Sequence, residues 1–252
     1  RSIPSWPSVH FENTGYAVLR SDARTVVIKY GPHGGGHGHP DKLSISVHNG
    51  DKEIVSDMGT CAYGVPAFTQ WYRKTLSHST LSVDAKDQSE STGKLLSFKV
   101  RKDGGEVLAE APEAYPGVRM NRKLVLKKDK LTDIYTALSD DEHLYDYVLI
   151  LTEKPVFSQA GESINLNDSP AYSYIKDAVI RKQSFPISCK VGNASLVIHM
   201  PDKQDFEVIT GEAPGIPPGN GSVLAKYDSP FCYPLIIRIK DKNFKIRTEW
   251  KF

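Results

Sequence analysis

Three histidines in a glycine-rich stretch are the residues of this sequence best suited to chemistry. His33, His37 and His39 lie within residues 31–42, together with five glycines. Glycine lets the backbone bend sharply and approach a ligand closely. His37 and His39 are two residues apart, so on an extended backbone their imidazoles point to the same side. Two imidazoles on one side are a common arrangement of metal ligands.

Two further candidate ligands follow along the chain. Residues 43–47 alternate apolar and polar side chains, and the Asn-Gly-Asp sequence at 49–51 predicts a tight hairpin turn. The returning strand ends at Asp57, and such a hairpin places Asp57 near His39, because both lie at the end away from the turn. His78 precedes another predicted strand. A His/Asp/His set, with water or another group in the fourth position, suits Zn²⁺.

The spacing by itself leaves other interpretations open. The His-Gly-His sequence also fits a tight turn whose imidazoles bond to the backbone, with Asp57 capping a turn and the histidines satisfied in the core. A cupin-type metal site, as in oxygenases or isomerases on a β-barrel, needs a Glu three to four residues after His-x-His. This chain has Leu43 and Ser44 there, which argues against that site.

Alternating hydrophobicity indicates that an antiparallel sheet positions these residues. Residues 16–20 and 25–30 predict a hairpin, and residues 244–252 place aromatic and aliphatic side chains on one face and charged ones on the other. Residues 118–126 alternate similarly, although Arg122 breaks the apolar row. The basic residues of the stretch 119–130 are expected to form a solvated strand face rather than a track for a polyanion. We predict an all-β fold, a large antiparallel β-sandwich.

Three other segments are less regular. Residues 210–222 contain three prolines and four glycines, which predicts an irregular loop. Residues 155–171 are polar and mixed, and residues 65–76 fit either a short helix or an extended loop.

Length and composition exclude several classes of protein. The 252 residues suit one large β domain or two tightly packed halves. With 32 basic and 30 acidic residues the net charge is +2, which argues against a dedicated nucleic-acid binder. No apolar run approaches the roughly 18 residues of a membrane span. The three cysteines are too few and too widely spaced for a disulfide framework.

Taken together, the segments around the candidate ligands resemble the heparinase II/III-like family of polysaccharide lyases. The matching sequences are His-Gly-His-Pro-Asp-Lys-Leu-Ser at 37–44, Asp-Met-Gly-Thr at 57–60, Tyr-Gly at 63–64, Trp-Tyr-Arg at 71–73, Ser-His-Ser-Thr at 77–80 and Val-Asp at 83–84. The preceding Gly-Pro-His-Gly-Gly looks most like the oligo-alginate lyase branch and related heparin and heparan lyase branches. Met58 departs from the family pattern, in which proline is more usual at this position.

The resemblance implies an architecture and a set of site residues. Residues 1–252 would form the C-terminal β-sandwich domain of an enzyme whose N-terminal (α/α) toroid lies outside this chain. The sandwich would hold a structural zinc ion, with the ligands His39, Asp57 and His78. The cleft between sandwich and toroid would contain His37 as a catalytic or carboxylate-contacting residue, with Tyr63, Tyr72 and Arg73 as further substrate contacts.

The reaction implied by the resemblance is β-elimination at a uronic acid. The substrate would be a uronic-acid polysaccharide or oligosaccharide of the alginate or heparin/heparan type, and the enzyme would act in the bacterial periplasm or outside the cell. Because half of the cleft would come from the toroid, we expect this chain by itself to have little or no lyase activity. The alternative is a non-catalytic carbohydrate-binding or interface β-sandwich.

Overall fold

The computed structural model describes residues 6–182, 186–200, 206–216 and 230–252. Within these residues the chain forms seventeen strands, most joined by short turns, with longer connections at residues 30–44 and 56–80. The strands are β1 Val9–Phe11, β2 Tyr16–Ser21, β3 Arg24–Lys29, β4 Ile45–Asn49, β5 Lys52–Val55, β6 Leu81–Val83, β7 Lys94–Arg101, β8 Gly104–Tyr115, β9 Val118–Lys127, β10 Lys130–Leu151, β11 Val156–Phe157, β12 Glu162–Ser163, β13 Lys176–Arg181, β14 Ile187–Val191, β15 Ala194–His199, β16 Phe206–Pro214 and β17 Phe231–Lys251.

Four single helical turns interrupt the loops. Three are 3₁₀ turns, η1 Gly35–His37, η3 Thr75–Ser77 and η4 Tyr172–Tyr174, and one is a π-helical turn, η2 Phe68–Tyr72. Residues 65–76 are therefore largely helical, one of the two forms that the sequence allowed. None of the helices among the described residues is long and apolar enough to cross a membrane.

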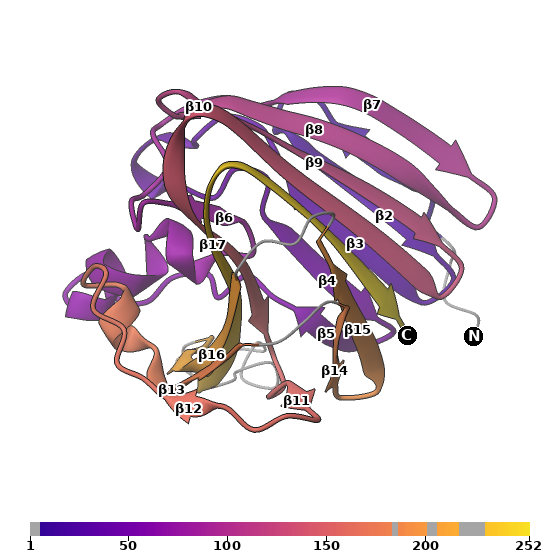
Figure 1. The fold of residues 1–252 in the computed structure, drawn as a ribbon. Helices are drawn as coiled ribbons and strands as arrows, with labels where there is room; N and C mark the ends of the chain where they lie inside the picture. Colours follow the sequence, from indigo (N-terminus) through magenta and orange to yellow (C-terminus); the bar gives the residue numbers. More distant parts are fainter. Residues whose placement is uncertain (1–5, 183–185, 201–205, 217–229) are drawn as a thin grey trace.

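The two longest strands, β10 and β17, organise the sheet. They pair antiparallel from Lys130 opposite Lys251 to Leu151 opposite Tyr233, with an irregularity between Leu138 and His143. The first half of β10 also pairs with β9, which continues to β8 and β7, whereas its second half pairs with β6. Figure 1 shows both long strands curving and the sheet folded over on itself. The fold is an antiparallel β-sandwich, as predicted.

The N-terminal strands form a meander that leads to the candidate ligands. β1 to β5 pair in chain order, and β5 reaches β10 where Val55 lies opposite Leu151. The two predicted hairpins are confirmed. The turn between β2 and β3 contains Asp22 with a φ of 48°, and β4 and β5 close with Asn49 opposite Lys52.

Two apolar clusters hold the elements together. The larger one joins strands from both ends of the chain and includes Leu19, Leu149 and Trp250, each fully buried. The smaller one packs Trp71, Leu76 and Met58 against residues of β10, β16 and β17. The smaller cluster therefore fixes η2 and η3, which lead directly into His78.

The sequence prediction was wrong for part of the segment 210–222. Residues 210–214 belong to β16, which pairs with β13 on one side and with β17 on the other, so tertiary pairing overrides the turn-forming composition there. Residues 217–222 lie outside the described residues. The segment 155–171 is largely irregular, as expected, with the short strands β11 and β12.

Arg122 is a second correction. The basic residues Arg119 and Lys127 of β9 are exposed, as expected, but Arg122 is fully buried. Its side chain is tolerated there because Asp133 of β10 accepts two hydrogen bonds from it, at 2.9 and 2.7 Å.

Candidate metal centre

Three chain segments converge beside the smaller cluster. Residues 31–44 connect β3 to β4, residues 56–60 follow β5, and residues 73–80 lead from η2 into β6. The first of these folds back onto β3, because the amide of Leu43 donates to the carbonyl of Lys29. Each segment contributes one predicted ligand, His39, Asp57 or His78, so these side chains come from three parts of the fold.

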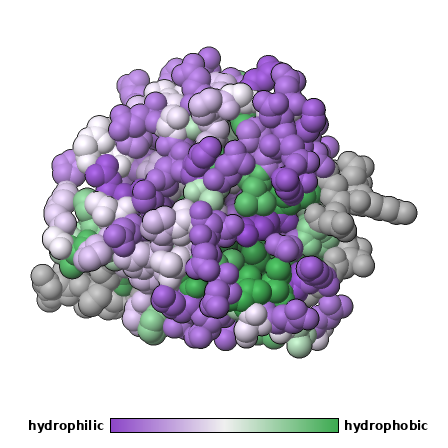
Figure 2. Space-filling model, turned by 60° about the vertical axis from the view of Figure 1, so that its left-hand side comes forward, coloured by the Kyte–Doolittle hydropathy of each residue, from purple (hydrophilic) through white to green (hydrophobic). Residues whose placement is uncertain are grey.

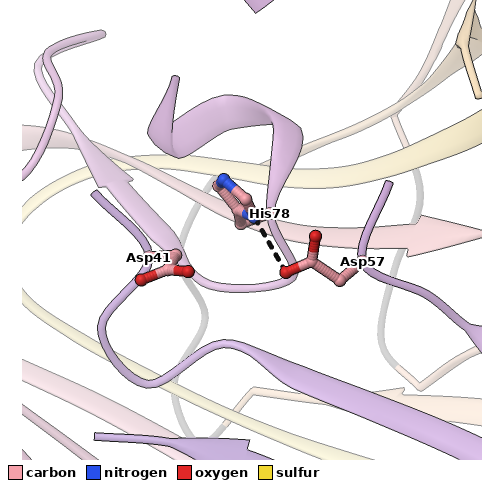
Figure 3. Close-up of side chains that lie close together, drawn as sticks. All are labelled: Asp41, Asp57 and His78. Carbon is pink, nitrogen blue, oxygen red and sulfur yellow. Dashed lines mark ion pairs between the residues drawn. The ribbon is translucent and has the colours of Figure 1, made fainter. Parts of the chain in front are cut away.

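Two of the predicted ligands, Asp57 and His78, are in contact, and the third, His39, lies beside the ring of His78 but outside the group of ligand atoms that lie within 4.8 Å of one another. His78 Nδ1 is 3.3 Å from Asp57 Oδ2, and Figure 3 shows the Asp57 carboxylate pointing toward the His78 ring. The ring centroids of His39 and His78 are 5.2 Å apart, with the planes inclined at 53°. The side chain of His78 is 1% exposed and that of Asp57 is 43% exposed. The candidate site is therefore buried at His78 and accessible to solvent at Asp57.

Asp41 is a neighbour that the sequence reasoning missed. One ligand atom each from Asp41, Asp57 and His78 lies within 4.8 Å of the others. Asp41 is buried, and its Oδ2 accepts a hydrogen bond from Lys29 Nζ at 2.6 Å. It follows His39 by two residues, the same spacing that drew attention to His37, so the signal was present in the sequence. Asp41 adds a carboxylate whose charge Lys29 already balances.

Buried polar atoms at this site lack partners within the described structure. Neither ring nitrogen of His78 makes a hydrogen bond within the described residues, and only Nδ1 has a charged neighbour there, Asp57. Asp41 Oδ1 also makes no hydrogen bond in this part of the chain, and its charged neighbour is Lys42 Nζ, 3.8 Å away. Leaving such groups unsatisfied in the interior is costly. Imidazole nitrogens and a carboxylate oxygen are ligands that Zn²⁺ accepts. The residues therefore fit a bound metal ion.

The electrostatics of the three side chains differ. Burial, with help from His78, lowers the pKa of His39 to about 4, so His39 is neutral near pH 7. Burial opposes charging His78, but the attraction of the nearby Asp57 carboxylate outweighs it and raises the pKa of His78. Burial also opposes charging Asp57, and His78 outweighs it in the same way, lowering the pKa of Asp57. A metal ion bound here would displace a proton from His78.

His37 and Tyr63 form an exposed pair next to this site. Both side chains lie on the surface, and Tyr63 Oη is 2.9 Å from His37 Nδ1, a hydrogen-bonding distance. The Tyr63 ring also packs on Phe68 of η2, with centroids 4.7 Å apart. His37 is thus held in place by a hydroxyl group while remaining open to solvent.

The other two predicted substrate contacts have different surroundings. Arg73 is half-buried, donates to the carbonyl of Gly38 at 3.1 Å and lies over the ring of Phe68. It therefore holds the peptide between His37 and His39. Tyr72 is 5% exposed and its hydroxyl donates to the carbonyl of Gly215 at 2.7 Å. Tyr72 is a packing residue without a free face for substrate.

The surface around the site is mostly polar. A groove of about 280 Å³ beside the glycine-rich segment is lined in part by His33, Arg73 and Gln88. On the face shown in Figure 2, hydrophilic residues cover most of the surface and apolar residues gather in one area. Tyr63 is 68% exposed, among the most exposed large hydrophobic side chains of the described residues.

The folded-over sheet defines a class of protein, the β-sandwich found at the C-terminal end of heparinase III. The heparan sulfate lyase HepC of Pedobacter heparinus superposes with a TM-score of 0.71 at 16% identity over 98% of this chain and 36% of its own. A heparinase III gene product gives a TM-score of 0.68 at 17% identity over 99% and 36%. At this identity the likeness shows a shared fold.

Sequence comparison identifies the family. The heparinase II/III-like C-terminal domain model matches residues 3–138, more than half of the chain, and the chain belongs to this family. A heparin-sulfate lyase of Bacteroides stercoris is 31% identical over 104 residues, which cover 37% of this chain and 16% of that protein. The chain thus spans about a third of the length of the solved relatives and matches a smaller share of the curated one.

Proposed function

We propose that this chain is the zinc-bearing C-terminal part of a polysaccharide lyase that cleaves uronic-acid-containing glycans by β-elimination. One observation carries the proposal: His78 is buried with Nε2 lacking any partner among the described residues and with Nδ1 facing the Asp57 carboxylate, and the His39 ring lies beside it. A buried imidazole left this way is understandable if a cation completes its bonding. Membership of a lyase family supports the same conclusion.

The proposed ligands are His39, Asp57 and His78. Zinc bound there would supply positive charge and join three loop segments by coordination. Such coordination would contribute folding free energy directly. The neutral imidazole of His39 is ready to donate its lone pair. The proposed role is structural: with His39 fixed, His37 two residues earlier is held on the outer side of the same loop.

The proposed chemistry needs proton transfer at the open side of this loop. In β-elimination a base removes the C5 proton of the uronate, the C4–O bond breaks, a C4=C5 double bond forms, and the leaving oxygen gains a proton. The hydrogen-bonded pair of His37 Nδ1 and Tyr63 Oη can accept one proton and supply another. Negative charge on the uronate carboxylate must also be balanced, and Arg73 in the adjoining groove provides a cation near the same loop.

The relatives suggest the class of substrate and an additional N-terminal domain. The name of the Bacteroides stercoris relative points to a heparin-type glycan, and we propose a sulfated or unsulfated uronate polymer of this kind. We further propose that an N-terminal helical toroid supplies the opposite wall of the cleft and that the enzyme works in the periplasm or outside the cell. Tyr72 is not among the proposed substrate contacts, because it is buried.

Metal content and lyase activity test the proposal separately. We expect about one zinc ion per chain by metal analysis, and a melting temperature that falls when EDTA removes it. The variant His39→Ala should lose the metal, whereas His48→Ala, which changes a half-buried strand histidine paired with Glu53, should keep it. Absence of zinc together with an unchanged melting temperature in EDTA contradicts the proposed site.

The catalytic part requires the complete enzyme. Incubation with a panel of uronate polymers should give an unsaturated product that absorbs in the ultraviolet, with His37→Ala strongly reduced. If the complete enzyme binds zinc but yields no unsaturated product from any uronate polymer, the proposed lyase activity is wrong. The domain would then be a non-catalytic carbohydrate-binding module.

A further inference from the structure

Arg122 lies at the centre of a buried network that reaches the metal centre from the opposite layer of strands. The side chain is fully buried in β9, and all five of its N–H donors have acceptors. Three go to β10: two to the carboxylate of Asp133 and one to the hydroxyl of Tyr147, at 3.1 Å. Tyr147 in turn donates to Asp133 at 2.6 Å. This part of the network fixes the plane of the guanidinium group.

The remaining two donors go to the ligand-bearing segments. Arg122 Nη1 donates to the carbonyl of Leu43 at 2.7 Å and to the carbonyl of Ser79 at 2.6 Å. Leu43 belongs to the segment of His39, and Ser79 directly follows His78. One guanidinium nitrogen therefore bridges the two loops that supply the imidazoles.

The backbone at Leu43 depends on such support. Leu43 has a φ of 62°, a conformation that residues with a side chain rarely adopt and that persists only when surrounding contacts hold it. The Leu43 side chain is fully buried, and its carbonyl is the group that Arg122 binds. The path of the chain from His39 into β4 is thus set partly by a donor from β9.

We propose that Arg122 is a positioning residue for the metal centre: by bridging Leu43 and Ser79 it sets the separation of His39 and His78. This inference rests on the proposed zinc site. A ligand pair held at the correct separation before binding loses less free energy on ordering, and residues that orient ligands commonly change metal affinity tenfold to a hundredfold.

The chain contains a matched control for a merely stabilising role. Arg238 of β17 makes the same two-pronged bond to a buried carboxylate, with both nitrogens 2.8 Å from Asp146, and also contacts Asp168. These partners, Asp146 and Asp168, both lie outside the ligand-bearing segments. Arg122 and Arg238 therefore share a two-pronged bond to a buried aspartate, but Arg122 alone has the two carbonyl contacts, and Arg238 is slightly exposed and has Asp168 as a second carboxylate partner.

The experiment compares Arg122→Lys with Arg238→Lys. Lysine keeps the charge but lacks the planar fork needed for several directed bonds. The zinc dissociation constant of each purified protein is measured by competition with a chromophoric chelator, and the unfolding of the metal-free proteins is followed in urea. We expect both variants to lose stability, and only Arg122→Lys to bind zinc about 10- to 100-fold more weakly.

Two milder variants decide the question if Arg122→Lys does not fold. Asp133→Asn loosens the hold on the Arg122 guanidinium, and Asp146→Asn does the same for Arg238. A weaker zinc affinity in Asp133→Asn than in Asp146→Asn supports the proposal. If Arg122→Lys and Arg238→Lys bind zinc equally well, or if Asp133→Asn and Asp146→Asn do, the positioning role of Arg122 is wrong, while the proposed zinc site stands. Failure of the unsubstituted protein to bind zinc is a distinct result that overturns the proposed function and this inference together.

Discussion

Two buried polar residues of this protein, Asp146 and His78, differ in whether their polar atoms have hydrogen-bond partners. The carboxylate of Asp146 and the imidazole of His78 are each 1% exposed. Asp146 receives two hydrogen bonds from Arg238 and one from the Tyr172 hydroxyl, whereas neither ring nitrogen of His78 has a hydrogen-bond partner in the described residues. The bonding of Asp146 is complete without any ligand, and that of His78 is not.

The difference separates a structural network from a binding site. A buried polar network whose members are all satisfied makes the core rigid and specific, and a partly satisfied one costs free energy. A sequence under pressure only to fold would replace an unsatisfied buried imidazole by an apolar residue. The retention of His78 beside Asp57, Asp41 and His39 is understandable if the cost is recovered when a cation binds.

The largest expected effect on stability comes from breaking the hydrogen-bond network of Asp146, Arg238 and Tyr172. We predict that Asp146→Ala lowers the free energy of unfolding by about 3 kcal/mol, because Arg238, whose side chain is 13% exposed, loses its main partner and keeps only Asp168. Urea denaturation with circular dichroism measures this change. Glu142→Ala, which breaks an exposed pair with Lys240, is the control and should change stability only slightly. Equal losses in the two variants would mean that the Asp146 network adds nothing beyond a surface pair.

Replacing His78 should have effects of opposite sign with and without metal. In zinc at about a hundredfold excess over its dissociation constant, His78→Leu should lose about 2.7 kcal/mol, the stabilisation that binding supplies. In EDTA the same variant should be as stable as the unsubstituted protein or more stable, because a buried imidazole without a hydrogen bond is gone and the Asp57 carboxylate is 43% exposed to water. Thermal unfolding in both buffers gives the two values. A similar loss in both buffers would show that His78 stabilises the fold without a metal.

Much of the scaffold could be predicted from the sequence because its signals are local. The Asn-Gly turn at 49–50 and the alternation in 244–252 correspond to the observed β4–β5 hairpin and to the end of β17. The exceptions have tertiary causes. Arg122 is buried because Asp133 lies opposite, and residues 210–214 form a strand because two neighbouring strands pair with them.

The candidate site was predictable in residue type but not in environment. The hairpin leading to Asp57 indicated which side chains lie near His39, but the two-residue spacing did not place His37 with them, because His37 ends the 3₁₀ turn η1 and lies on the surface beside Tyr63. Nothing local distinguishes Tyr63, which is exposed, from Tyr72, which is buried, because the packing of η2 against distant strands determines the difference. Asp41 has the same two-residue spacing from His39, but that spacing does not reveal that its carboxylate is buried beside Lys29.

The pH dependence of zinc binding should sharpen the comparison further. Since the attraction to Asp57 outweighs burial and raises the pKa of His78 above its usual 6.5, the metal-free site is protonated at pH 6 and zinc must displace that proton. Zinc affinity should therefore rise by about tenfold per pH unit until the pKa of His78 is passed, and then level off. His39, with its pKa lowered to about 4 by burial and by His78, adds no further slope above pH 5.

Chelator competition from pH 5.5 to pH 9 measures this curve. The Arg238–Asp146 pair supplies the control, because its arginine stays charged throughout this range. The variant Asp146→Asn should therefore show the same dependence of zinc affinity on pH as the unsubstituted protein. A zinc affinity that is constant with pH, after correction for the chelator, would show that His78 is not a ligand.

The smallest expected effect on stability belongs to the exposed pair of His37 and Tyr63. His37→Ala and Tyr63→Phe should each change the free energy of unfolding by less than about 0.5 kcal/mol and leave zinc binding unchanged, because both side chains lie on the surface. In the complete enzyme the same substitutions should lower kcat/KM by about 10²- to 10⁴-fold if the pair transfers protons. Tyr174→Phe removes a comparable hydroxyl that donates to Gln70 and should leave the rate unchanged. If all three variants retain the full rate, proton transfer must come from residues outside this pair, and the sandwich would then act by holding substrate.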